Sequence, residues 1–417
     1  MKFGQFIASA PAAVGEDVAK EFRSCLDTGP PVAFTDVRAI IEHDIGRPLR
    51  DIFARFEETP FAAASMSVVF DAQLHDGRRV AVKVLRPGIG RIVAADLAIL
   101  QPLVRFLARQ GSDTASTLLN YLIGLQEQIR EELDLRNEAE AMGQFAAAFK
   151  AADLPLLVVP DVYHELTSRR VLTMEFLDGV PIDDLTQIAA LERDPRPLVV
   201  ELLHAWLVTG VRFGAFHADI HAGNLLLLAD GRLGVIDWGI VARLDADMHL
   251  LFRRLVEAGL GIESAWGDIV AHVLRVQGSS LRDGLGLSDA QVAQLVRAML
   301  EPVLTRPVGE GSMAVLFGSS DELIRLATGE TPPRRTARDR FNIWSKARRS
   351  NRIAIELGVG ETNFRRANFL AAKQLIYLER YWKIYLADEA ILGDHAFLER
   401  LLASSEANTH TERESRG

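Results

Sequence analysis

The sequence has a single cysteine, Cys25, in 417 residues. One thiol cannot form an intramolecular disulfide, so we expect a reducing, cytoplasmic setting and an inert cysteine. Basic residues are outnumbered by acidic ones, 47 to 56, and the net charge of −9 argues against nucleic-acid partners. No uncharged apolar run reaches the ~18 residues that a transmembrane helix needs, and the N-terminus lacks the apolar core of a signal peptide. These absences predict a soluble protein or a peripheral membrane protein.

Hydrophobic residues make up 48% of the chain, which is enough for a sizeable core. The length allows two domains or lobes, because a domain commonly has ~100–200 residues. Residues 35–58 and about 92–152 are predicted to be helical, the second region with a break at 111–113. From residue 245 onward the pattern is almost entirely helical, with a wide apolar face over 368–386. We see no internal repeat.

Three oxygen-bearing side chains flank a predicted β-hairpin in the stretch from Phe216 to Gly239. Asp219 and Asn224 lie in the loop before its first strand, and Asp237 lies just after its second strand. A hairpin brings its two ends together, so these side chains can meet at one point. Clusters of this kind hold Mg²⁺, which takes one or two carboxylates together with substrate phosphates.

The spacing of these residues matches two kinase motifs. His217-Ala218-Asp219, with Asn224 five residues after the aspartate, has the pattern of a kinase catalytic loop. Asp237-Trp238-Gly239 stands where kinases have Asp-Phe-Gly. Each motif alone fits an ordinary cap or turn, but the two in order favour a metal–nucleotide site. No Ala-Pro-Glu and no Ser/Thr-rich loop follow Gly239, although protein kinases seat a peptide there.

Lys83 is the one charge inside the apolar strand predicted over 80–85. It is either an edge-strand lysine that keeps the strand soluble or the kinase lysine that binds the α- and β-phosphates. The second interpretation requires a carboxylate partner. Asp134 and Glu138 are four residues apart on one predicted helix face, so both project in one direction and Lys83 is a candidate cation for them.

Two further segments suggest contacts with ligands. The apolar strand over 171–177 is either an ordinary core strand or a lobe-connecting hinge, in which the backbone from Glu175 to Leu177 would bind an adenine ring. Between residues 334 and 352 there are eight basic residues and one acid. This stretch is either a solvated face or a surface that lies on an anionic membrane. The polar tail after Ser404 is predicted to be disordered.

With these residues in view, the sequence resembles the UbiB/AarF family of atypical, protein-kinase-like proteins linked to quinone and isoprenoid-lipid metabolism. The matching motifs are Lys2-Phe3-Gly4-Gln5, Ala62-Ala63-Ala64-Ser65, Val80-Ala81-Val82-Lys83 with Arg86-Pro87-Gly88, Glu132-Leu133-Asp134, Glu138, and the segment from His217 to Asn224. The family's alanine-rich loop continues Ile-Gly-Gln-Val-His, whereas this chain has Met66-Ser67-Val68-Val69-Phe70.

The resemblance implies an α+β, bilobal protein-kinase-like fold, with a small β-rich N-lobe containing helical insertions and a mostly helical C-lobe. The implied parts are an N-terminal helical extension over 1–60, an N-lobe over 61–178, a C-lobe over 179–403 and a tail over 404–417.

The resemblance also assigns roles in an ATP and Mg²⁺ site. The implied catalytic residues are Asp219, Lys83 and Glu138, and the implied metal ligands are Asn224 and Asp237. The implied nucleotide- or cleft-binding residues are Lys83, Ala63, Ala64, Ser65, Glu175, Leu177, Lys2, Gln5, Glu132 and Asp134. The Lys-x-Gly-Gln segment would fold over the cleft, with Lys2 near Glu132 and Asp134.

Three functions remain open at this point. The first is an ATPase or a kinase of small molecules or lipids, since His221 replaces the lysine that protein Ser/Thr kinases have two residues after the catalytic aspartate. The second is a nucleotide-binding pseudokinase that scaffolds a lipid-biosynthesis complex. The third is a sugar or antibiotic phosphotransferase. A nucleotide is the expected partner, and an anionic membrane surface at the inner face of the membrane, an isoprenoid lipid and a second copy of the chain are further candidates.

Overall fold

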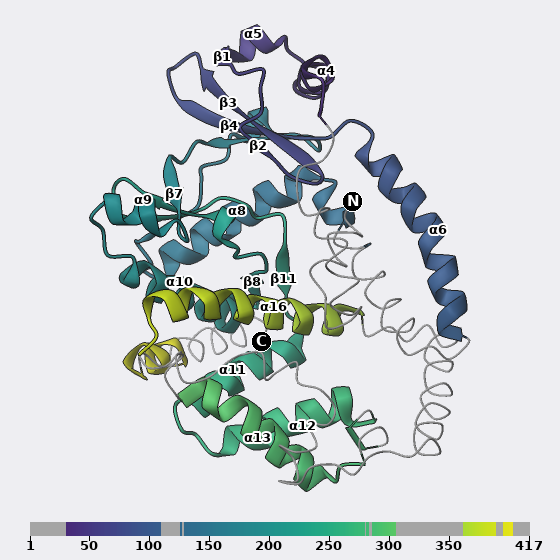
Figure 1. Ribbon diagram of the computed structural model, residues 1–417, viewed down its shortest axis with the longest axis vertical. Coiled ribbons are helices and arrows are strands. Elements are labelled where there is room, and N and C mark those ends of the chain that lie inside the picture. Colours follow the sequence, from purple (N-terminus) through teal and green to yellow (C-terminus); the bar gives the residue numbers. More distant parts are fainter. Residues whose placement is uncertain are drawn as a thin grey trace, which may run out of the picture.

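The computed structural model describes residues 31–109, 126, 129–279, 281–282, 286–305, 362–388 and 395–402. These residues form two lobes, a β-rich one and a mostly helical one (Figure 1). The predicted α+β bilobal fold is therefore confirmed. The Lys2–Gln5 motif, the basic stretch over 334–352 and the tail after Ser404 lie outside the described residues, as does the predicted break at 111–113.

The smaller lobe is built on an antiparallel sheet with the strand order β1-β3-β4-β6, to which β2 adds by pairing with β3. The strands are β1 (Phe53–Phe56), β2 (Ala62–Ala63), β3 (Ser67–Leu74), β4 (Arg79–Leu85) and β6 (Val171–Glu175). The β3–β4 turn contains Gly77 at a φ of 90°, which favours glycine. Lys83 faces Val69 of β3 on one side and Leu172 of β6 on the other. It therefore lies on a central strand, and the edge-strand interpretation was wrong.

The helix predicted over 35–58 is shorter than expected. Helix α4 (Phe34–Ile45) ends at Gly46, whose φ of 76° terminates it, and a single turn, α5 (Leu49–Ile52), precedes β1. Residues 53–56 form a strand because Phe53 and Phe56 pack in the sheet core, with the ring centroids of Phe56 and Phe70 5.4 Å apart. Tertiary packing overrides the helical pattern here.

The chain continues from β4 into helical segments. Helix α6 (Ile89–Arg109) extends along one side of the molecule (Figure 1). Helix α8 (Leu135–Ala151) packs against both lobes, and Asp134 caps it by accepting a hydrogen bond from the Arg136 N–H. Its buried face, which includes Met142 and Phe145, belongs to the main hydrophobic core.

The larger lobe contains two small sheets and a set of helices. One sheet has the order β5-β10-β9-β7, and β8 and β11 form the other. The strands are β5 (Leu157–Val158), β7 (Gly179–Pro181), β8 (Ala215–His217), β9 (Leu225–Leu228), β10 (Leu233–Val235) and β11 (Val241–Arg243). The helices are α9 (Leu185–Ala190), α10 (Arg196–Phe213), α11 (Ala246–Gly259), α12 (Ser264–Ser279), α13 (Asp289–Thr305) and α16 (Thr362–Tyr385), with a 3₁₀ turn at Ala222–Asn224. The 3₁₀ turn at His164–Leu166 packs beside β6 in the smaller lobe. The predicted hairpin is confirmed as β9–β10. In the described part of the chain, no helix is both long and apolar enough to cross a bilayer.

Candidate active site

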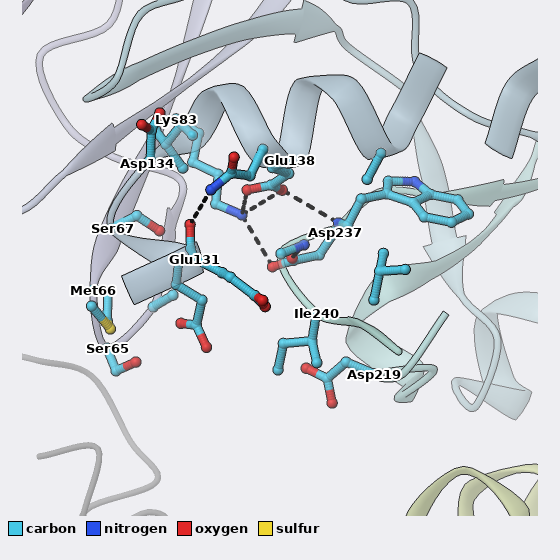
Figure 2. Close-up of a pocket in the computed structure, with 18 of the residues that line it drawn as sticks. Ser65, Met66, Ser67, Lys83, Glu131, Asp134, Glu138, Asp219, Asp237 and Ile240 are labelled. Carbon is cyan, nitrogen blue, oxygen red and sulfur yellow. Dashed lines mark hydrogen bonds and ion pairs between the residues drawn. The ribbon is translucent and has the colours of Figure 1, made fainter. Parts of the chain in front are cut away.

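A cavity of about 630 Å³ lies between the two lobes. The alanine-rich segment and the residue after it, Met66, line one wall, and Lys83 on β4 and Glu138 on α8 line another. Asp219 and Asp237 close the cavity from the larger lobe, on the side across from Ser65 (Figure 2). The motifs that lie far apart in the sequence therefore meet around one space.

Lys83 joins the two lobes through two carboxylates. Its Nζ atom lies 2.7 Å and 2.9 Å from the Glu138 carboxylate oxygens and 3.2 Å from Asp237 Oδ2 (Figure 2). The expectation that Asp134 and Glu138 both face Lys83 was wrong for Asp134. The Asp134 carboxylate caps α8 and pairs with the Arg136 guanidinium instead of with Lys83.

Lys83, Glu138 and Asp237 shift one another's pKa values. Burial alone would raise the pKa of Asp237, but the Lys83 ammonium and the Gly239 N–H lower it well below the usual range. Burial works against the Lys83 cation too, yet Asp237 and Glu138 outweigh it and raise the pKa of Lys83. One cation faces two acids, so the burial of Glu138 together with the Asp237 charge raises the pKa of Glu138 to about 7, against the attraction of Lys83.

This pKa predicts a pH dependence. Deprotonated Glu138 holds Lys83, so we expect any activity that depends on the position of Lys83 to rise as the pH passes upward through about 7. The folded protein holds the Glu138 proton more tightly than the unfolded chain, so the free energy of unfolding falls as the pH rises from 4.5 to about 7. A pH profile of kcat/KM checks this, and Glu138→Gln should remove the step at about 7. Glu165→Gln, an exposed residue that does not line the cavity, is the control. An unchanged step in Glu138→Gln would contradict the assignment.

Trp238 fixes the segment that carries Asp237. Its ring is buried, lies 4.5 Å from the Phe145 ring of α8 between centroids, and donates its Nε1–H to Val235 O at 2.8 Å. Its backbone N–H donates to Glu138 Oε1 at 3.3 Å. The large apolar side chain thus anchors the Asp-Trp-Gly segment on α8 and keeps Asp237 facing the cavity.

His217 connects the two catalytic motifs. Its Nε2 lies 2.6 Å from Asp237 O and its Nδ1 lies 3.0 Å from the Asp219 N–H. A carbonyl only accepts and an N–H only donates, so the ring carries its proton on Nε2 and is neutral. Burial lowers the pKa of His217, which maintains this form. Asn224 joins the same group by donating its side-chain N–H to Asp219 O at 2.9 Å. The backbone of Asp219 and Asp237 and the Asn224 side chain therefore belong to one hydrogen-bonded network. Asp219 and Asp237 line the cavity, and the convergence of the three side chains on a metal ion stays a prediction.

The residues present suit a magnesium ion. Asn224 uses its amide nitrogen as a donor to Asp219 O, so its oxygen is the atom suited to a metal. Asp237 supplies a carboxylate at the cavity wall. Within the described ranges no group of three or more His, Cys, Asp or Glu side chains forms a metal cage. An amide and one carboxylate still fit Mg²⁺, because this ion draws its other ligands from water and substrate phosphates.

The alanine-rich segment forms a tight turn between β2 and β3. The Ala64 N–H donates to Ser67 O at 2.9 Å, and Met66 is buried. Arg86 secures the turn, since its Nε donates to Ala64 O at 3.0 Å and its backbone N–H donates to Met66 O at 2.9 Å. Arg86 is part of a family motif, but no role was predicted for it, although its position three residues after Lys83 is a usable signal. Met66 and Ser67 close the turn without any need for glycine at a positive φ.

The predicted adenine contact lies away from this cavity. Neither Glu175 nor Leu177 lines it. Between them, the Phe176 N–H donates to Arg79 O at 3.3 Å, and the Arg79 guanidinium lies 3.6 Å from the centroid of the Phe176 ring. The role of this segment as a hinge stays a prediction. Glu132 and Asp134 do line the cavity, whereas their expected neighbours Lys2 and Gln5 lie outside the described residues.

Helix α16 contributes contacts that no motif indicated. Gln374 is fully buried and hydrogen-bonds the backbone on both sides of Asp219, at Ala218 O and at the Ile220 N–H. Leu370, one turn earlier, lines the cavity. A glutamine in an amphipathic helix carries no signal of this kind in a single sequence.

Comparison with known proteins agrees with this arrangement. The ABC1 atypical kinase-like domain matches residues 24–263. The chain belongs to the ABC1 atypical kinase-like family. The resemblance to UbiB/AarF proteins is confirmed, because an uncharacterized chloroplastic aarF domain-containing protein kinase of Arabidopsis thaliana is 32% identical over 403 residues, which is 94% of this chain and 71% of that protein.

Two other relatives, and one solved structure, show how far the likeness extends. A Mycobacterium tuberculosis protein, uncharacterized by name, is 39% identical over 75% of this chain and 64% of its own length. A protein of Cellvibrio japonicus named probable protein kinase UbiB is 31% identical over 75% of this chain, which spans only 56% of that relative. A Mycobacterium tuberculosis protein solved in complex with erythromycin shares the fold, with a TM-score of 0.51, 24% identity and coverage of 93% of this chain and 92% of that one.

Proposed function

We propose that this ABC1-family protein binds ATP and Mg²⁺ and is an atypical kinase or ATPase, acting on a small molecule or lipid or on water. The observation that carries the proposal is the pairing of Lys83 with both Glu138 and Asp237 at the wall of a cavity that also contains Asp219. Burying a charged lysine between two acids costs desolvation free energy, so we expect such a lysine where its charge has a function.

In this proposal each residue has one role. Lys83, held by Glu138, binds the α- and β-phosphates, and Asn224 and Asp237 hold Mg²⁺. The bound ion neutralises phosphate charge. Asp219 orients a hydroxyl group or a water molecule and accepts its proton. Ala63, Ala64 and Ser65 cover the phosphates from the smaller lobe.

The acceptor is proposed to be a non-peptide. Protein Ser/Thr kinases have a lysine where this chain has His221, whose Nε2 lies 3.8 Å from Asp219 Oδ2. A link to quinone or isoprenoid-lipid metabolism is supported by the relatives named UbiB. We place the protein in the cytoplasm or at the inner face of a membrane, as a peripheral protein.

A nucleotide-binding scaffold without turnover is the second candidate. The observation in its favour is the substitution of Met66 and Ser67 for the glycine-containing continuation of the loop. ATP hydrolysis measured with and without anionic liposomes separates the two, because an enzyme hydrolyses ATP under at least one condition. Binding of ATP without turnover, even with lipid present, would favour the scaffold.

The metal assignment has its own test. We expect Asp237→Asn to lose most Mg-dependent ATP turnover and to require at least about 10-fold more Mg²⁺ for half-maximal rate, since a neutral amide is a weaker ligand than a carboxylate. A Mg²⁺ titration of the rate measures this. Asp230→Asn, at the far end of the same hairpin, is the matched control. Turnover like that of the wild type in Asp237→Asn would refute the assignment.

A further inference from the structure

Helix α16 is bonded to the catalytic loop through side chains that are almost completely buried. Gln374 is 0% exposed and Tyr381 is 1% exposed. Gln374 Oε1 accepts from the Ile220 N–H at 2.8 Å, and its Nε2 donates to Ala218 O at 2.6 Å. The Tyr381 hydroxyl donates to Ile220 O at 3.2 Å. The helix lies across the middle of the molecule, beside β8 and β11 (Figure 1).

These bonds complete the pairing of the backbone around Asp219. The Ala218 N–H donates to Ile240 O, the Asp219 N–H to His217 Nδ1, and the Asp219 carbonyl accepts from Asn224 Nδ2. The other three polar groups of this tripeptide, Ala218 O and both backbone groups of Ile220, bond to α16. Buried backbone groups are almost always paired, so the loop conformation depends on this helix.

We propose that Gln374 and Tyr381 are positioning residues, which hold the peptide groups on either side of Asp219 and so aim its carboxylate into the cavity. This proposal rests on the proposed function, in which Asp219 is the catalytic base. Gln374 suits the task because a single amide both accepts and donates, and therefore fixes the two peptide groups that flank Asp219 with one rigid side chain.

The docking of α16 does not depend on these two residues. The Tyr385 hydroxyl donates to Ile182 O at 2.6 Å, and Arg380 pairs with Asp183 at 2.9 Å. Trp382 and Leu378 are buried in the main hydrophobic core. The loss of one bond to the catalytic loop therefore leaves the helix in place.

Two tyrosines on this helix form a matched pair for the first test. Tyr381→Phe removes a hydroxyl bonded to the catalytic loop, and Tyr385→Phe removes a hydroxyl bonded to Ile182. We expect Tyr381→Phe to lower kcat by about 3- to 10-fold, the range for one neutral hydrogen bond, with unchanged binding of Mg-ATP. Tyr385→Phe should leave kcat unchanged. Equal rates in the two variants would overturn the proposal.

Substitutions at Gln374 give a second test that a merely structural role would not satisfy. In Gln374→Glu, a protonated carboxyl can still donate to Ala218 O and accept from the Ile220 N–H, whereas a carboxylate cannot donate. Burial raises the pKa of such a carboxyl. The rate relative to the wild type should therefore be near one at about pH 6 and fall about 10-fold by about pH 8. Gln374→Leu should be low throughout, and a flat ratio in Gln374→Glu would overturn the proposal.

Hydrogen exchange separates this proposal from the proposed function. Gln374→Leu should speed exchange of the Ile220 amide by at least about 10-fold, while Tyr385→Phe should not, whether or not the protein hydrolyses ATP. Absence of turnover in the wild type would refute the proposed function alone. Unchanged exchange at Ile220 in Gln374→Leu would refute the positioning role alone.

Discussion

Asp219→Asn is expected to lower ATP turnover by about 10²- to 10⁴-fold, the usual contribution of a general base. The amide has the shape of the carboxylate but accepts no proton at neutral pH. The bonds that hold this loop run through backbone atoms of residues 218–220, so the substitution leaves them in place. Steady-state kinetics measure the loss, and calorimetry of Mg-ATP binding should show an unchanged affinity.

Asp178→Asn provides the control for this comparison, because its side chain is 88% exposed. The same change of charge there should alter turnover by less than about 2-fold. If Asp219→Asn hydrolysed ATP at a rate within about 3-fold of the wild type, another group would have to accept the proton, and the assignment of Asp219 would fail.

Lys83→Met is expected to destabilise the fold by about 3–5 kcal/mol in addition to removing the cation that we propose binds phosphate. The substitution leaves the buried Glu138 carboxylate with no cation from this lysine, and an uncompensated buried charge has a cost of this size. The Asp237 carboxylate, 37% exposed, adds less because solvent screens it. Both acids would bind protons more tightly in the folded state, so the loss of stability should grow as the pH rises above 4.5. Urea denaturation at two pH values measures both effects.

Two variants sharpen this prediction. Lys150→Met, at the exposed end of α8, is the matched control and should change stability by less than about 0.5 kcal/mol. The double variant Lys83→Met with Glu138→Gln should recover part of the lost stability, because one of the two unpaired charges has been removed. If the single variant Lys83→Met were as stable as the wild type, the pairing with Glu138 and Asp237 would contribute little to the free energy of unfolding.

The sequence predicted best those parts of the site that are local in the chain. The spacing of Asp219, Asn224 and Asp237 around a short hairpin is sufficient to bring them together, because the hairpin geometry leaves few alternatives. Lys83 was identified by a different signal, a single charge in an apolar strand. Its partner Glu138 came from the family pattern, and the structure confirms the pair at 2.7 Å.

The errors have physical causes that a single sequence does not contain. Residues 53–56 pair with β3 because Phe53 and Phe56 complete the sheet core, and a helical periodicity cannot reveal a distant strand partner. Asp134 has the spacing of a second Lys83 ligand, but Arg136, two residues away, competes for it more effectively. Gln374 acts on residues 154 and 156 positions earlier through a neutral amide, a contact with no local pattern.

The bonds between α16 and the catalytic loop also set an order of events during synthesis. The ribosome makes Ile220 154 residues before Gln374, which is about 8–30 s at ordinary rates of elongation. During that interval Lys83, Glu138 and Asp237 can already assemble, while three polar backbone groups around Asp219 lack their final acceptors and donors. Under the proposed function, a nascent chain can therefore form the Lys83 cluster before it acquires a competent catalytic loop, and turnover is expected only after α16 has docked.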